Sequence, residues 1–146
     1  MQAEYFPVAS AVLILETVIV IVLLIGWLFG ARRLEFTLHH RAVYSIVLIH
    51  SITVGVWMIP RALSLVSYIM ADPVGNLPLI LHDTLGIIAV VLGLIVGVTF
   101  IIRRDMPLKL LKRTRPIMLV ILVLWLTTFF LGIVVFFIGW ISFLPF

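Results

Sequence analysis

Four long, uninterrupted apolar stretches constrain the fold of this chain more than any other feature. They cover residues 7–30, 42–60, 79–102 and 116–140, and each is close to the roughly 20 residues that a helix needs to cross a bilayer. Apolar and polar residues do not alternate within them, as they do in the strands of a membrane barrel. Helices are the remaining way to satisfy every backbone polar group in lipid. The sequence therefore predicts an all-α, up-and-down four-helix bundle, with residues 1–146 forming a single transmembrane domain.

The composition agrees with a membrane location and excludes several kinds of site. Hydrophobic residues make up 64% of the chain and charged residues 11%, and the mean hydropathy is +1.37, which no ordinary water-soluble domain shows. The absence of cysteine excludes disulfides, thiolate metal sites, iron–sulfur clusters and covalent haem attachment. The first apolar stretch has neither a basic start nor a small-residue cleavage site, so we expect it to remain as a helix.

The basic residues predict how the helices are oriented. Nine of the ten lie in the links between the first and second and between the third and fourth stretches, and only Arg61 lies on the other side. The positive-inside bias then makes these two links cytoplasmic and places the second link and both termini outside. This predicts a multi-pass protein of the cell membrane. Although the net charge is +4, the cations lie where they contact lipid headgroups, so nucleic acid is not an expected partner.

The second stretch and its flanks, "LHHRAVYSIVLIHSITVGVWMIPR", carry the residues that point to chemistry. On a helix, His39 and His50 share one sector with Arg61. His50 is near the middle of the span, where an ionisable side chain indicates a functional site. The alternative is a neutral histidine hydrogen-bonded to a neighbouring helix. His39 and His40 also have a simpler interpretation, at headgroup level beside Arg41.

The third stretch places His82 on a stripe of small residues that includes Gly86, Gly93 and Gly97. Such a stripe is typical of close helix packing, and Gly93 and Gly97 form a small-xxx-small pair. It would also leave a slot for a flat cofactor, and two imidazoles from facing helices suit the iron of haem b. Both interpretations stay open.

Under the haem interpretation, His50 and His82 are the first-choice metal ligands, with His39 in reserve and Arg61 among the cofactor-binding candidates. Residue counts from the presumed membrane edges put His50 near the midplane and His82 about 10 Å further out. A shared iron then requires tilted helices, a tilted haem or a kink at Pro60. Copper or zinc is the weaker alternative, because the histidines lie at different depths.

Glu16 is the carboxylate inside the first stretch. Its expected depth is close to that of His82 and Arg61. It is a candidate proton acceptor or quinone-headgroup site, and the alternative is a simple pair with Arg61.

Three segments together resemble a family of small four-helix membrane proteins that includes the cytochrome oxidase assembly factor CtaM. They are "LLIGWLFGARRLEFTLHHRAVY", "LILHDTLGIIA" and "LWLTTFFLGIVVFF", and the residues that carry the likeness are His39, Trp57, His82, Trp125 and Gly132. The chain departs from the family pattern where histidines are expected, with Arg61 after the second span and Thr114 in the third link, and His50 is an addition. The resemblance implies a link to respiratory haem or copper proteins.

We therefore expect a haem-b-binding membrane protein that takes part in respiratory electron transfer, with quinone as a candidate partner. It would be an electron carrier or a subunit, in contact with other subunits of a respiratory complex, rather than a stand-alone enzyme. The alternative is a non-catalytic assembly factor or accessory subunit of a haem–copper oxidase or another respiratory membrane complex.

Overall fold

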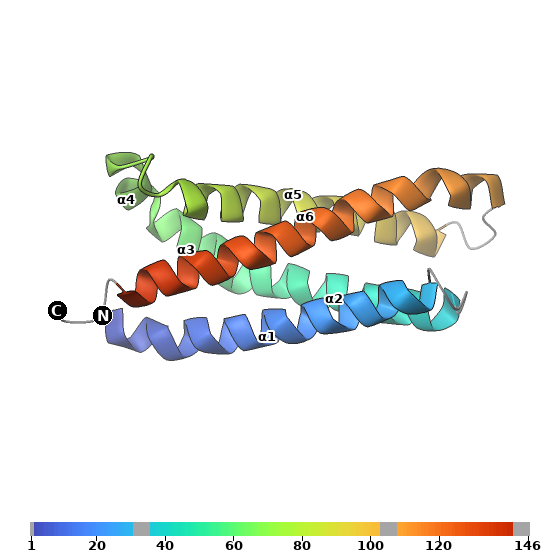
Figure 1. Cartoon of the computed structure of the whole chain (residues 1–146), viewed down its shortest axis with the longest axis horizontal. Coiled ribbons are helices and arrows are strands. Elements are labelled where there is room, and N and C mark those ends of the chain that lie inside the picture. Colours follow the sequence, from blue (N-terminus) through green and yellow to red (C-terminus); the bar gives the residue numbers. More distant parts are fainter. Residues whose placement is uncertain (1, 31–35, 103–107, 142–146) are drawn as a thin grey trace.

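A computed structural model of the chain shows the predicted all-α four-helix bundle (Figure 1). It describes residues 2–30, 36–102 and 108–141, with side chains for 7–30, 37–102 and 115–139. The long helices are α1 (Gln2–Leu28), α2 (Phe36–Thr53), α5 (Leu77–Ile102) and α6 (Leu108–Ile141).

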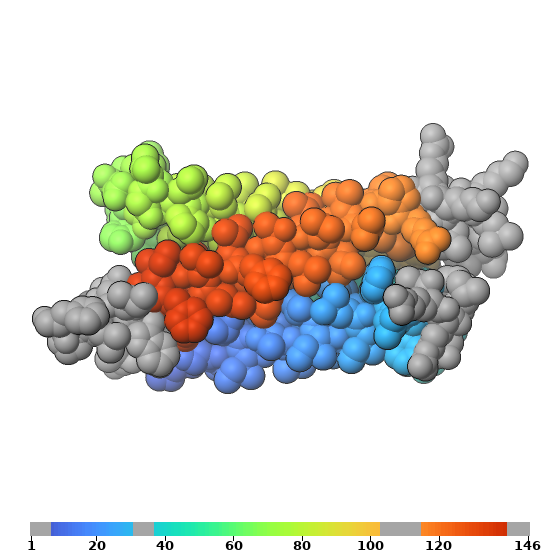
Figure 2. All heavy atoms as spheres, in the orientation of Figure 1, coloured from blue at the N-terminus to red at the C-terminus, as the bar shows by residue number. Residues whose placement is uncertain are grey.

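Consecutive long helices run antiparallel, so that α1 begins and α6 ends at the same end of the bundle (Figure 1). The contact between α5 and α6 is the most extensive among the described helices, and α1 with α2, α2 with α5 and α6 with α1 complete the ring. Figure 2 shows α6 crossing diagonally over the face between α1 and α5. Each long helix therefore packs against two neighbours, which leaves one face of each helix outward.

The outward faces are apolar, as a bilayer requires. Four spans are long and apolar enough to cross a membrane, and only 22–28% of each span is buried inside the bundle. Exposed aliphatic and aromatic side chains occur on all four helices, as in Ile14, Leu48, Ile95 and Phe130. Because water would not tolerate this surface, the chain is a multi-pass membrane protein. The sidedness stays a prediction, and Arg32, Arg33, Arg103 and Arg104, on which it depends, lie outside the described residues.

The second span changes its helical geometry just before Pro60. A π-helical turn, η2 (Val54–Met58), follows α2, and the backbone N–H of Ile59 donates to the carbonyl of Val54. Proline lacks an N–H and its ring crowds the preceding turn, so a wider turn relieves the helix at this point. The chain continues outward as α3 (Ile59–Ser64) and α4 (Val66–Ala71). The following segment makes the predicted turn, and Pro78 lies in the first turn of α5.

The last helix is longer than the apolar pattern predicts. It begins at Leu108 rather than near Pro116, and Pro116 lies inside it. The predicted link is rich in leucine, lysine and arginine, which favour helix, so helical structure continues beyond the apolar stretch. One hydrophobic cluster of the buried core lies between α1, α2 and α6 and consists of Ile19, Leu23, Ile46, Val47, Ile121 and Trp125. Buried side chains of α5, Ala89 and Val90, also belong to the core.

Candidate functional site

A carboxyl group and an imidazole form a buried pair between α1 and α2. Glu16 Oε1 and His50 Nδ1 lie 2.8 Å apart and share a hydrogen bond. The two residues are only 8% and 4% exposed. Burying a polar group is costly unless the group has a hydrogen-bond partner. Here the carboxyl group and the imidazole are each other's partner. Glu16 is therefore paired with His50, a partner that the residue counts from the membrane edges do not suggest.

Trp125 of α6 covers the buried pair. Its ring centroid lies 4.6 Å from that of His50, and the residue is 3% exposed. Its indole Nε1 is buried and has no hydrogen-bond partner in the described part of the chain. Trp125 thus contributes packing to the core while its N–H remains unsatisfied.

His82 of α5 is held by the backbone of α6. Its Nδ1 lies 2.9 Å from the carbonyl oxygen of Thr128. The ring rests on Gly132, where an added Cβ would lie 2.8 Å from a ring carbon of His82. The carbonyl and the glycine are four residues apart, so one helical turn of α6 supplies both the acceptor and the space for the ring.

His39 of α2 is held by α1 in the same way. Its Nδ1 lies 2.8 Å from the carbonyl oxygen of Gly26. The ring rests on Gly30, where an added Cβ would lie 2.8 Å from two ring atoms of His39. Again the carbonyl and the glycine are four residues apart. We call this arrangement a histidine clamp, and it occurs once in each helical hairpin, at His39 and at His82.

The clamps fix which nitrogen of each ring carries the proton. A carbonyl oxygen can only accept, so Nδ1 of His39 and of His82 must be the donor. The Nε2 atom of the neutral ring then presents a lone pair, and it has no hydrogen-bond partner among the residues that the structure describes. Histidines that bind metals are oriented in this way, with one nitrogen donating to a carbonyl or carboxylate and the other coordinating the metal.

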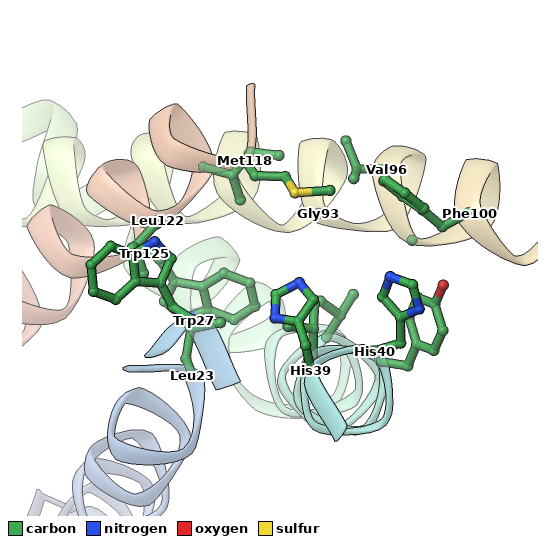
Figure 3. A pocket seen from close by; sticks show the side chains of 15 residues that line it. Leu23, Trp27, His39, His40, Gly93, Val96, Phe100, Met118, Leu122 and Trp125 are labelled. Carbon is green, nitrogen blue, oxygen red and sulfur yellow. The ribbon is translucent and has the colours of Figure 1, made fainter. Parts of the chain in front are cut away.

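Only His39 of the two clamped histidines lines the cavity found between the helices. Figure 3 shows its ring pointing from α2 into this space, with Met118 of α6 on the opposite side. The cavity has a volume of about 80 Å³, is partly open to the outside and is almost entirely apolar. Its walls come from all four long helices and include Trp27, Tyr44, Gly93, Gly97, Phe100 and Trp125.

His40 also lines the cavity, at the end where α2 begins. Its ring lies 5.7 Å from that of Tyr44 in a stacked arrangement and 5.6 Å from that of Phe100. These rings form the aromatic wall of the cavity next to His39.

The glycine stripe on α5 is largely filled by protein. An added Cβ at Gly86 would lie 3.2 Å from Thr128, and one at Gly93 would lie 3.5 Å from Trp125. Gly97 leaves more room, since Tyr44 is 3.9 Å away. Along most of the stripe, the glycines therefore allow close packing of α5 and α6. Space for a ligand remains only toward the cavity, beside Gly93 and Gly97.

The predicted ligands His50 and His82 contact α6 about one turn apart. Trp125 touches His50 and Thr128 holds His82, which corresponds to about 4.5 Å of helix rise. Arg61 is exposed on α3. The described side chains include no group of three or more histidines and carboxylates arranged to hold a metal. The shared iron stays a prediction.

Several residues of the site cannot be predicted by looking only for polar side chains in the sequence. Gly26 and Gly30 have a visible signal, two glycines one helical turn apart just before a histidine-rich segment. The acceptors at Gly26 and Thr128 are backbone carbonyls, which any residue supplies, so no residue type identifies them. Met118 looks in sequence like one more apolar side chain.

Searches of protein-family models, of curated proteins and of solved structures find no match to this chain.

Proposed function

We propose that this protein binds a redox metal centre through His39, inside the membrane, and serves in the respiratory chain as a subunit or electron carrier. The histidine clamp at His39 is the observation that carries the proposal. It holds the ring with Nδ1–H donated to the carbonyl of Gly26 and directs the free Nε2 into an apolar cavity. Among the described residues this lone pair has no hydrogen-bond partner, and a metal ion would use it.

Haem b is the cofactor that the sequence predicts, and the residues fit it in one respect. A neutral imidazole with a fixed Nδ1–H suits an axial ligand of haem iron. The cavity volume of about 80 Å³ is well below the roughly 300–1,000 Å³ of typical cofactor pockets. A whole porphyrin could therefore enter only if α6 moved away from α2. Haem b held by His50 and His82 remains a separate prediction, in which Glu16 would orient the His50 ring.

The experiment is an absorbance spectrum and a metal analysis of the protein purified from membranes, together with His39→Asn. We expect the wild-type protein to carry a metal centre and His39→Asn to lose it. His82→Asn is the matched control, because it removes the other clamped histidine, which does not line the cavity. A protein that contains no metal and no haem under any reducing condition refutes the proposal. Loss of haem in His50→Ala and His82→Asn, but not in His39→Asn, would move the site to the first-choice ligands.

The second candidate is a non-catalytic assembly factor or accessory subunit of a haem–copper oxidase. It is supported by the resemblance at His39, His82, Trp125 and Gly132, since all four of these residues form part of a clamp or cover the buried pair. Deletion of the gene should then abolish oxidase maturation, and complementation with His39→Asn should fail. Normal oxidase activity in the deletion strain contradicts this role.

A further inference from the structure

Besides the side chains of His39, His40 and Tyr44, the cavity is lined by one further electron-pair donor among the described residues, and this donor is a sulfur atom. Met118 reaches into the cavity from α6, and Figure 3 shows its thioether on the side opposite the His39 ring. Methionine often fills gaps in cores simply because it is flexible. Here it faces a histidine whose orientation is fixed by the clamp, so a nitrogen and a sulfur donor approach one space from two helices.

The size of that space decides between classes of ligand. The cavity of about 80 Å³ has room for a single ion but is too small for a macrocycle. A one-ring organic head group is disfavoured by chemistry as well as by size. Almost all of the wall is apolar, and a thioether is only a weak acceptor for a polar head group.

The donor set decides between metal ions. Thioether sulfur is a soft ligand that selects Cu(I), and imidazole is also a good copper ligand. Zinc takes four ligands in tetrahedral geometry and accepts oxygen donors, and the described side chains around the cavity include no carboxylate. A buried cation is tolerated where it is coordinated, and Cu(I) carries only a single positive charge.

We infer that His39 Nε2 and Met118 Sδ form an intramembrane site for one Cu(I) ion. The inference rests on the proposed function, namely that His39 binds a metal, and it names the metal and the second ligand. The clamp orients the histidine, the glycines at positions 93 and 97 keep the space open, and aromatic rings line the cavity next to His39.

The test is a titration of the copper-depleted, full-length protein in detergent with Cu(I), in competition with a coloured Cu(I) chelator and under anaerobic, reducing conditions. The wild-type protein should bind one Cu(I). Met118→Leu, which keeps the size of the side chain, should bind more weakly by at least the roughly 10–100-fold that loss of an outer-shell partner costs. Met118→His should restore binding with a nitrogen ligand. Met70→Leu is the matched control, since Met70 is 71% exposed on α4, and it should bind like the wild type.

A separate variant tests the clamp without touching either ligand. Gly30→Ala should displace the His39 ring and weaken Cu(I) binding about 10–100-fold. Gly139→Ala is its control, because an added Cβ there meets nothing within 4 Å. X-ray absorption of the loaded protein should show one sulfur neighbour of copper, which Met118→Leu should lose. Circular dichroism checks that each variant remains helical.

Two results overturn the copper site, and they are distinguishable from failure of the proposed function. If Met118→Leu binds Cu(I) as tightly as the wild type, Met118 is not a ligand. If the protein takes up no Cu(I) but contains haem that His39→Asn loses, the inference fails and the proposed function stands. If neither copper nor haem binds, both fail.

Discussion

Replacement of Glu16 and His50 by leucine, singly and together, tests whether the buried pair is an energetic unit. Leucine has a similar volume to both side chains, so the core keeps its packing while the polar groups disappear. In Glu16→Leu the imidazole N–H of His50 loses its acceptor while it remains buried. In His50→Leu the carboxyl group loses its donor. Each single change leaves one buried polar group unsatisfied, which costs about 1–3 kcal/mol of the free energy of unfolding.

The double variant removes both polar groups, so no unsatisfied atom remains. Its loss of stability should therefore be smaller than the sum of the single losses. The expected difference is about 0.6–1.7 kcal/mol, the range from the average to the maximum that double-mutant cycles give for hydrogen bonds between membrane helices. The full burial of both partners, at 8% and 4% exposure, places this pair at the upper end of that range. A coupling above about 3 kcal/mol would instead identify an ionised pair.

The assay is unfolding in mixed detergent micelles by increasing SDS, followed by circular dichroism. Unfolding curves of the wild type, the two single variants and the double variant give the coupling free energy. Additivity within about 0.3–0.5 kcal/mol is the behaviour of independent sites. That result would refute the pair as a unit and would make Glu16 and His50 two separately tolerated polar residues.

Substitutions at Gly132 and Trp125, with Gly139→Ala as a control, test the packing of the site. Gly132→Ala should destabilise the bundle by about 1–3 kcal/mol through overpacking, because the new Cβ would lie 2.8 Å from the His82 ring. Gly139→Ala should not destabilise it. Equal melting temperatures of the two variants in detergent would contradict the clamp. Trp125→Phe should change stability little, since the Nε1–H that it removes has no partner among the described residues, while Trp125→Ala should cost about 3–5 kcal/mol by leaving a cavity. A large loss in Trp125→Phe would show that the indole N–H is satisfied in the membrane.

The apolar pattern predicts the helices well and their ends less well. The four spans and the turn before Pro78 are confirmed, because about 20 apolar residues in lipid have no alternative to helix. The predicted fourth span, 116–140, agrees with the apolar span Arg115–Gly139. The helix α6 itself begins eight residues before the predicted span, at Leu108, since hydropathy reports the membrane segment and not the whole helix. The π-helical turn before Pro60 appears in the sequence only as a possible kink.

The site itself is less accessible to sequence reasoning. His39, His50, His82 and Glu16 stand out because ionisable groups are costly in lipid, and all four have partners in the fold. Their partners do not stand out in the same way. Two of them are backbone carbonyls, and the third, Glu16, was expected at a different depth.

The number of helices and their contact with lipid follow from the sequence alone. Each depends on the free energy of transferring one segment from water into the bilayer, and that free energy depends only on the residues of the segment. Which imidazole meets which acceptor depends on how far each helix is rotated and shifted against its neighbours. A shift of one residue turns a side chain by about 100°, so only the assembled bundle brings Glu16 to His50 and places His39 and Met118 on the walls of one cavity.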